Sequence, residues 1–223
     1  MTDISYQSLH PQPDAEMAYL RWIAHLDTEF TRHQNPDRRS EIVRDQLHQL
    51  YLGRPHGGKL NFTLDTELPF NVLELTLDPR NVTLEAEYSV EGSTEQYALR
   101  KPLLWFWQMF DRSPVGLNHW LGFRFRVMLG RHLFRHIGHN VTIFHGVEFP
   151  YGHNLTIEDD CVVHSHVRLD DHGEILLRRG SSIAEHAILG APARDGGHPP
   201  TEIGPNAHVP YDAIIRAGER VDH

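Results

Sequence analysis

Hydrophobic positions recur every six residues in the last two-fifths of the chain. Written as hexads from residue 137, nearly every hexad opens on an aliphatic or aromatic residue, and its fifth residue is usually small or β-branched. Three hexads plus two residues make one row, and rows begin at Ile137, Ile157, Leu177 and Ile203, which are 20, 20 and 26 residues apart. A single row cannot bury its own hydrophobic face, so we predict short strands that coil into stacked turns of a parallel β-helix.

The third row contains six extra residues. They fall in "ILGAPARDGGHPPTEIG", 188–204, where the hexad pattern is lost among glycine, proline and polar residues. An insertion of this kind can project from a corner of a repeat structure without disturbing the stacked core. We therefore expect a surface loop here that carries His198 and Pro199.

The N-terminal part has other periodicities. Apolar residues at helical spacing predict an amphipathic helix over 14–33 and a second over 35–53, where Asn35 suits the N-cap and Gly53 the stop. Alternating patterns in "KLNFTL" (59–64) and "NVTLEAEYSV" (81–90) predict strands. Residues 1–100 are thus expected to form a small α+β domain, whose role the sequence leaves open.

A segment rich in aromatic residues and arginine, 102–136, joins the two parts. It is predicted to be a helical cap over the open end of the β-helix, where core and strand edges would otherwise be exposed. An interfacial membrane helix or a partner-docking surface is the less favoured alternative. The predicted organisation is a small α+β domain over 1–100, a helical cap over 101–136 and a left-handed β-helix over 137–223, so that the chain is expected to be mainly β.

Composition narrows the functional classes. The 223 residues have 21 Lys and Arg against 30 Asp and Glu, for a formal net charge of −9, and this argues against nucleic acid as a partner. The N-terminus lacks the features of a signal peptide, and no apolar run has the length of a membrane span. One cysteine excludes a disulfide framework. We expect a cytoplasmic protein in which Cys161, at an inward hexad position, is a buried and unreactive thiol.

The hexads, the stretch "VRLDDHGEIL" (167–176) and the His-Pro pair in the interruption resemble the hexapeptide-repeat acyltransferases. Within that family they look most like the sugar O-acetyltransferases of the galactoside and maltose type. The resemblance covers 137–223 and none of the first hundred residues. It implies a left-handed parallel β-helix, a homotrimer, acetyl-CoA or another acyl-CoA as co-substrate, a small-molecule hydroxyl acceptor such as a sugar, and no metal.

The resemblance also assigns roles to individual residues. His198 would be the catalytic base that accepts a proton from the acceptor hydroxyl. Asp170, Asp171 and His166 would bind the acceptor. Arg216 and Arg220 would bind phosphates of the coenzyme.

Several alternatives remain open at this point. His166 and His186 lie 20 residues apart and compete with His198 for the role of base, while polar turns or solvated side chains would explain all of these residues without any function. A second functional class is a zinc lyase similar to the γ-class carbonic anhydrases, in which His164, His166 and His186 could supply the zinc ligands. A β-helix scaffold that has lost its site is the third class. Two departures from the family favour it over the lyase: His198 lies farther past the hexad opener Leu189 than the family's catalytic histidine does, and fewer rows follow it.

Overall fold

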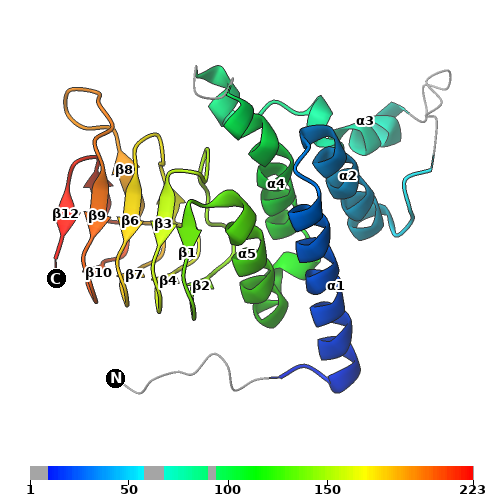
Figure 1. The fold of residues 1–223 in the computed structure, drawn as a ribbon, viewed down its shortest axis with the longest axis horizontal. Coiled ribbons are helices and arrows are strands. Elements are labelled where there is room, and N and C mark those ends of the chain that lie inside the picture. The colour runs from blue at the N-terminus through cyan, green and yellow to red at the C-terminus, as the bar shows by residue number, and fades with distance from the viewer. Residues whose placement is uncertain (1–9, 58–67, 90–93, 223) are drawn as a thin grey trace.

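The structure is a computed structural model and describes residues 10–57, 68–89 and 94–222. All helices found in these ranges precede the strands in the sequence. In Figure 1 the helices gather at one end of a stack of short strands, and the C-terminus lies at the other end. The helices and 3-10 helices are α1 (Pro13–Arg32), α2 (Pro36–Leu52), α3 (Leu68–Thr76), η2 (Pro79–Asn81), η3 (Glu85–Tyr88), α4 (Glu95–Arg112), η5 (Pro114–Leu117) and α5 (His119–Leu133).

Both N-terminal helices predicted from the sequence are confirmed. The Asn35 side chain accepts the backbone N–H of Arg38 at the start of α2, and Gly53 ends that helix with φ of 65°, a conformation that glycine adopts without strain. Helix α1 starts at Pro13 and buries Leu26 and Phe30 against the other helices. Proline at the first helical position and glycine after the last one mark helix ends as expected.

The strand predicted over 81–90 is wrong. Up to residue 89 this segment forms the end of η2 and all of η3 instead. The Asp78 side chain accepts the backbone N–H of Arg80, and the Glu87 side chain accepts that of Leu84, so short-range side-chain bonds favour tight turns over an extended chain. The strand predicted over 59–64 lies outside the described residues.

Helix α4 lies at the centre of the helical part and also contacts the strands. Its buried face carries Trp105, Phe106 and Phe110, and the Trp107 indole donates to the backbone oxygen of Val147 at 2.9 Å. Helix α5 packs against α1 on one side and against the first strands on the other. The described helices include none that is long and apolar enough to cross a membrane.

The strands form three parallel sheets. The five-stranded sheet has the order β1-β3-β6-β9-β12, the four-stranded sheet β10-β7-β4-β2, and the three-stranded sheet β11-β8-β5. Consecutive strands along the chain therefore belong to different sheets. The strands are β1 (His136–Ile137), β2 (Thr142–Ile143), β3 (Leu155–Ile157), β4 (Val162–Val163), β5 (Arg168–Leu169), β6 (Ile175–Leu177), β7 (Ser182–Ile183), β8 (Ile188–Ala191), β9 (Thr201–Ile203), β10 (His208–Val209), β11 (Ile214–Arg216) and β12 (Arg220–Val221).

The row spacing derived from the hexads is confirmed by the strand register. Ile137 pairs with Ile157, Ile157 with Leu177, and Leu177 with Ile203, so partners are 20, 20 and 26 residues apart. Most hexad openers and fifth positions are buried between the sheets. Cys161 is among them, fully buried with its Sγ 3.1 Å from the backbone oxygen of Arg178, and burial raises the pKa of its thiol.

The predicted fold class, a mainly β chain built as a left-handed β-helix, is wrong. Helices account for 44% of the residues and strands for 16%, and the strands are short, parallel and distributed over three sheets, so the chain is α/β-like. The hexad pattern covers only 137–223, and each of its strands has two to four residues. The helices between 13 and 133 therefore outweigh the strands.

Candidate functional site

The insertion in the third row forms a loop between β8 and β9 that projects from one edge of the strand stack (Figure 1). Two local bonds shape this loop: the Ala193 N–H donates to the Gly197 backbone oxygen, and the Asp195 side chain accepts the Gly197 N–H at 2.9 Å. The end of the loop then lies directly on Gly173 of the preceding turn. A Cβ atom on Gly173 would lie only 2.2 Å from the carbonyl oxygen of His198.

This contact brings His198 into a cluster with Asp170 and His172, here called the histidine cluster. The imidazole rings of His172 and His198 have centroids 4.9 Å apart. The Asp170 Oδ1 atom lies 3.5 Å from Nε2 of His172. His198 is half-buried, and its Nδ1 atom is buried without a hydrogen-bond partner among the described residues. The arrangement is a carboxylate, an imidazole beside it, and a second imidazole that is half-buried.

The other ring nitrogen of His172 faces the helical part of the molecule. Its Nδ1 atom is 3.4 Å from the hydroxyl of Tyr151, which in turn is 2.6 Å from the hydroxyl of Ser89. Tyr151 is buried, and Ser89 follows η3. His172 is thereby contacted at both ring nitrogens, which fixes its orientation between Asp170 and Tyr151.

Asp171, the second predicted acidic residue, points into the interior. It is fully buried, and its Oδ1 atom accepts the backbone N–H of Tyr151 at 2.9 Å. Burial raises the pKa of this carboxyl to about 7, although hydrogen bonds from backbone N–H groups oppose the shift. Its position indicates a role in holding the corner of the preceding turn, because the carboxylate satisfies backbone donors there.

His166 is not part of the histidine cluster. It lies in the connection between β4 and β5, where it has φ of 60°. Its ring stacks on that of His186, with the ring centroids 5.3 Å apart. His145 follows on the other side at 5.1 Å, and burial lowers its pKa. The neighbouring His164 has its Nδ1 atom 3.4 Å from Glu185. Within the described residues, no three His, Cys, Asp or Glu side chains are placed to hold a metal ion.

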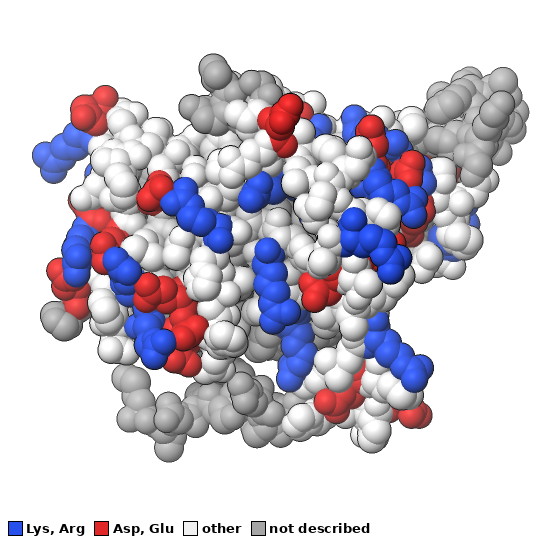
Figure 2. Space-filling model, viewed as in Figure 1, with Lys and Arg blue, Asp and Glu red and all other residues white. Residues whose placement is uncertain are grey.

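The two predicted phosphate-binding arginines differ in their surroundings. Arg216 donates from Nη1 to the backbone oxygen of Pro192 at the start of the loop, and its guanidinium has no carboxylate partner in the described part of the chain. Arg220 is instead ion-paired with Asp222 and Glu202. These pairs belong to a network that continues across the five-stranded sheet, where acidic and basic side chains alternate (Figure 2).

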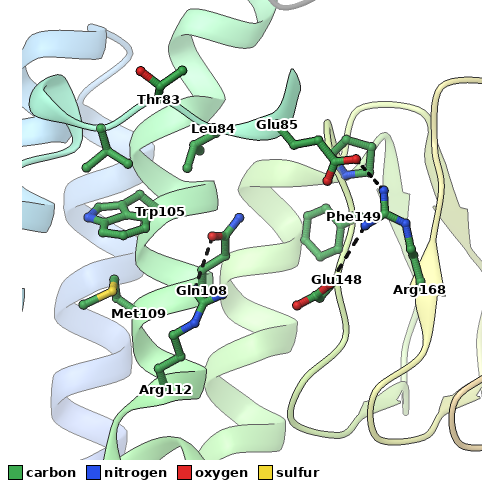
Figure 3. A pocket seen from close by; sticks show the side chains of 12 residues that line it. Thr83, Leu84, Glu85, Trp105, Gln108, Met109, Arg112, Glu148, Phe149 and Arg168 are labelled. Carbon is green, nitrogen blue, oxygen red and sulfur yellow. Dashed lines mark hydrogen bonds and ion pairs between the residues drawn. The ribbon is translucent and has the colours of Figure 1, made fainter. Parts of the chain in front are cut away.

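A cavity of about 510 Å³ lies next to this region, between α4, η3 and the strands. Figure 3 shows Gln108 and Arg112 reaching into it from α4, with Glu148 and Arg168 on the strand side. Arg168 connects the cavity with the histidine cluster, since its Nη2 atom is 2.6 Å from Glu85 and 3.7 Å from Asp170. The hydrogen bond with Glu85 is the main cause of its raised pKa.

The sequence thus pointed to only part of this region. The structure brings His198 and Asp170 together, and places Arg216 near the same loop, but puts His166 and Arg220 elsewhere. His172 was missed, although it directly follows the acidic pair in "LDDHGE". The contact partners of His172 come from different turns and from the helical part, so only its polar neighbours in the sequence could have suggested it. No protein-family model matches the chain, and no curated protein matches its sequence.

Proposed function

We propose that the protein is an enzyme that transfers an acyl group from a coenzyme A thioester to a hydroxyl of a sugar or similar small acceptor. The histidine cluster is the observation on which the proposal depends most. A half-buried imidazole beside a second imidazole and a carboxylate is an arrangement that suits a general base. The resemblance of the hexads and of the His-Pro loop to hexapeptide-repeat acyltransferases supports the same reaction.

In the proposed reaction His198 accepts the proton of the acceptor hydroxyl as its oxygen attacks the thioester carbonyl. The new carbon–oxygen bond forms, the carbon–sulfur bond breaks, and the proton passes from His198 to the departing thiolate. His172 and Asp170 are positioning residues: the carboxylate beside His172 favours positive charge on the imidazole pair as the proton arrives. A backbone N–H near the loop would stabilise the oxyanion of the tetrahedral intermediate.

The donor is proposed to bind beside the loop. Arg216 fits a phosphate of coenzyme A, because its guanidinium is exposed and unpaired with any described carboxylate. Arg220 does not fit this role as well, since Asp222 and Glu202 already neutralise it. We further propose a cytoplasmic location and a homotrimer, the assembly of the family that the hexads resemble.

The test is an acyl-transfer assay with acetyl-CoA and a panel of sugars, combined with metal analysis of the purified protein. The proposal predicts release of free coenzyme A that depends on an acceptor hydroxyl, without stoichiometric zinc. The absence of turnover with every acyl donor and acceptor would instead favour a non-catalytic scaffold. Stoichiometric zinc together with carbon dioxide hydration would favour the lyase.

A further inference from the structure

A continuous groove runs along α4 beside the strands. The cavity of about 510 Å³ and a second one of about 230 Å³ have Gln108, Arg112 and Glu148 as common lining residues, so we treat them as one groove. Arg168 and Glu85 line one end, and His145 and His166 line the other. The combined space falls in the range of small-molecule sites, which are roughly 300–1,000 Å³.

Arg112 is the lining arginine whose guanidinium has no carboxylate partner among the described residues. The other lining arginine, Arg168, has Glu85, Glu148 and Asp170 within ion-pair distance. Arg112 makes only a 3.3 Å hydrogen bond to the side chain of Gln108, and it has no carboxylate partner in the described part of the chain. Arg112 is the last residue of α4, so the helix dipole stabilises its positive charge. That interaction leaves the N–H groups of the guanidinium available for hydrogen bonds. The planar guanidinium can therefore form a bidentate pair with a carboxylate or phosphate.

The other residues that line the groove indicate which chemical groups the rest of the ligand carries beside its anionic group. Glu148 is exposed and reaches into the groove opposite Gln108 (Figure 3), so a carboxylate acceptor and an amide face the same space. Leu84, Met109 and Phe149 supply an apolar wall. Hydroxyl groups on a compact ring would donate to Glu148 and Gln108, while the carbon face of the ring would contact the apolar wall.

We propose that this groove binds a small hydroxylated anion, a sugar bearing a phosphate or a carboxylate, with Arg112 as its anion-binding residue. The groove adjoins the histidine cluster through Arg168, but the inference does not depend on acyl transfer. Because Glu85, Glu148 and Asp170 already surround Arg168, Arg112 is the guanidinium of the groove that remains available to pair with an anionic group. A charge-assisted bidentate pair of this kind contributes enough that its removal reduces affinity by roughly tenfold or more.

Titration calorimetry with glucose 6-phosphate, glucuronate, inorganic phosphate and glucose tests this site. We expect glucose 6-phosphate, glucuronate or both to bind at least tenfold more tightly than glucose. The sugar anion that binds more tightly shows whether the groove prefers a phosphate or a carboxylate. Inorganic phosphate alone should bind more weakly than the preferred sugar anion, because it cannot use Glu148 and the apolar wall.

Two variants make the test specific. Arg112→Gln should lower the affinity for the sugar anion at least tenfold and leave circular dichroism and thermal unfolding unchanged. Arg131→Gln is the matched control, because Arg131 is an exposed arginine on α5, remote from this groove, and should bind as the wild type does. Equal affinity of wild type and Arg112→Gln, equal weakening by the control, or no binding of either sugar anion at millimolar concentration would overturn the proposal.

Discussion

The buried carboxylate of Asp171 makes the free energy of unfolding depend on pH. Its pKa is about 7 in the folded protein and about 4 in an unfolded chain. Between these values the folded state holds a proton that the unfolded state has lost, so stability falls as pH rises from about 4 to about 7 and is then constant. The loss is at most roughly 4 kcal/mol, since one pKa unit corresponds to about 1.4 kcal/mol.

Asp171→Asn should remove this dependence, because asparagine keeps an oxygen that accepts the Tyr151 N–H but does not ionise. Relative to wild type, the variant should be more stable at pH 8 than at pH 5, by roughly 1 kcal/mol or more. Urea unfolding at the two pH values measures the difference. An equal difference between variant and wild type at both values would show that Asp171 does not titrate in this range.

At the level of single residues, the sequence pointed to a candidate site at the place where the hexad pattern is broken. The interruption drew attention to His198, and the acidic pair at 170–171 was singled out because "LDD" resembles an acidic pair of the galactoside-type acetyltransferases. Which member of the pair faces His172 and which is buried could not be predicted, because hexad phase alone does not determine side-chain direction at a corner. His172 itself has no periodicity that marks it.

Arg126 joins the helical part to the strands. Its side chain is 1% exposed and donates to Asp111 at 2.8 Å and to the backbone oxygens of Gly116 and Ile143. Asp111 also accepts the backbone N–H of Gly146 at 2.8 Å, although burial raises the pKa of its carboxyl. One ion pair thus bridges α4, α5 and the first turn of strands.

Arg126→Met should therefore destabilise the protein by about 3–5 kcal/mol, because it leaves the Asp111 carboxylate buried without its partner. Arg131→Met, on the exposed face of the same helix, should change stability by no more than about 0.5 kcal/mol. Chemical denaturation of both variants provides the comparison. A small effect of Arg126→Met would mean that the two parts are held together by apolar packing alone.

The loop after β8 depends on a glycine for its position. Because a Cβ atom on Gly173 would meet the His198 carbonyl oxygen at 2.2 Å, Gly173→Ala should displace the loop and His198 with it. We expect the rate of acyl transfer to fall by up to about a hundredfold, as misplacement by about 1 Å can do, with thermal unfolding little changed. Gly57→Ala, where the nearest atom would be at 3.4 Å, is the control. Wild-type turnover by Gly173→Ala would contradict the position assigned to the loop.

Helices were predicted more reliably than strands in the N-terminal part. Asn35, Pro36 and Gly53 fix the ends of α2 by local backbone chemistry, which can be recognised in the sequence. The alternating pattern over 81–90 resembles a strand, but Asp78 just before the segment and Glu87 within it accept nearby backbone N–H groups and stabilise turns. No neighbouring strand pairs with the described part of this segment, so alternation alone was insufficient.

For the whole molecule, the sequence predicted the register between paired strands better than the fold class of the chain. Residues 20 and 26 apart pair as the hexads indicate, because inward positions must align to bury a common core. The expectation of a mainly β chain failed because the first 133 residues, which lack any hexad pattern, contribute most of the regular structure as helices. A strong repeat in one part of a chain does not determine the class of the whole.

The proposed assembly can be tested at the same scale. Light scattering at micromolar concentration should give three times the mass of one chain, 25.7 kDa. Exposed apolar side chains on the last turn, Tyr211 and Ile214, are 61% and 56% accessible in the single chain and are available for contacts between copies. A monomer at this concentration would reject the trimer and any active site formed between copies.

The central claim is that His198 is the base for acyl transfer. The most direct measurement compares turnover of wild type, His198→Ala and His186→Ala with the same acyl donor and acceptor. His198→Ala should lower the rate by roughly two to four decades, the usual contribution of a general base. His186→Ala removes an exposed imidazole at a different corner and should retain most activity. Wild-type turnover by His198→Ala, with loss of activity in His186→Ala, would place the base at the His166–His186 corner and contradict the account.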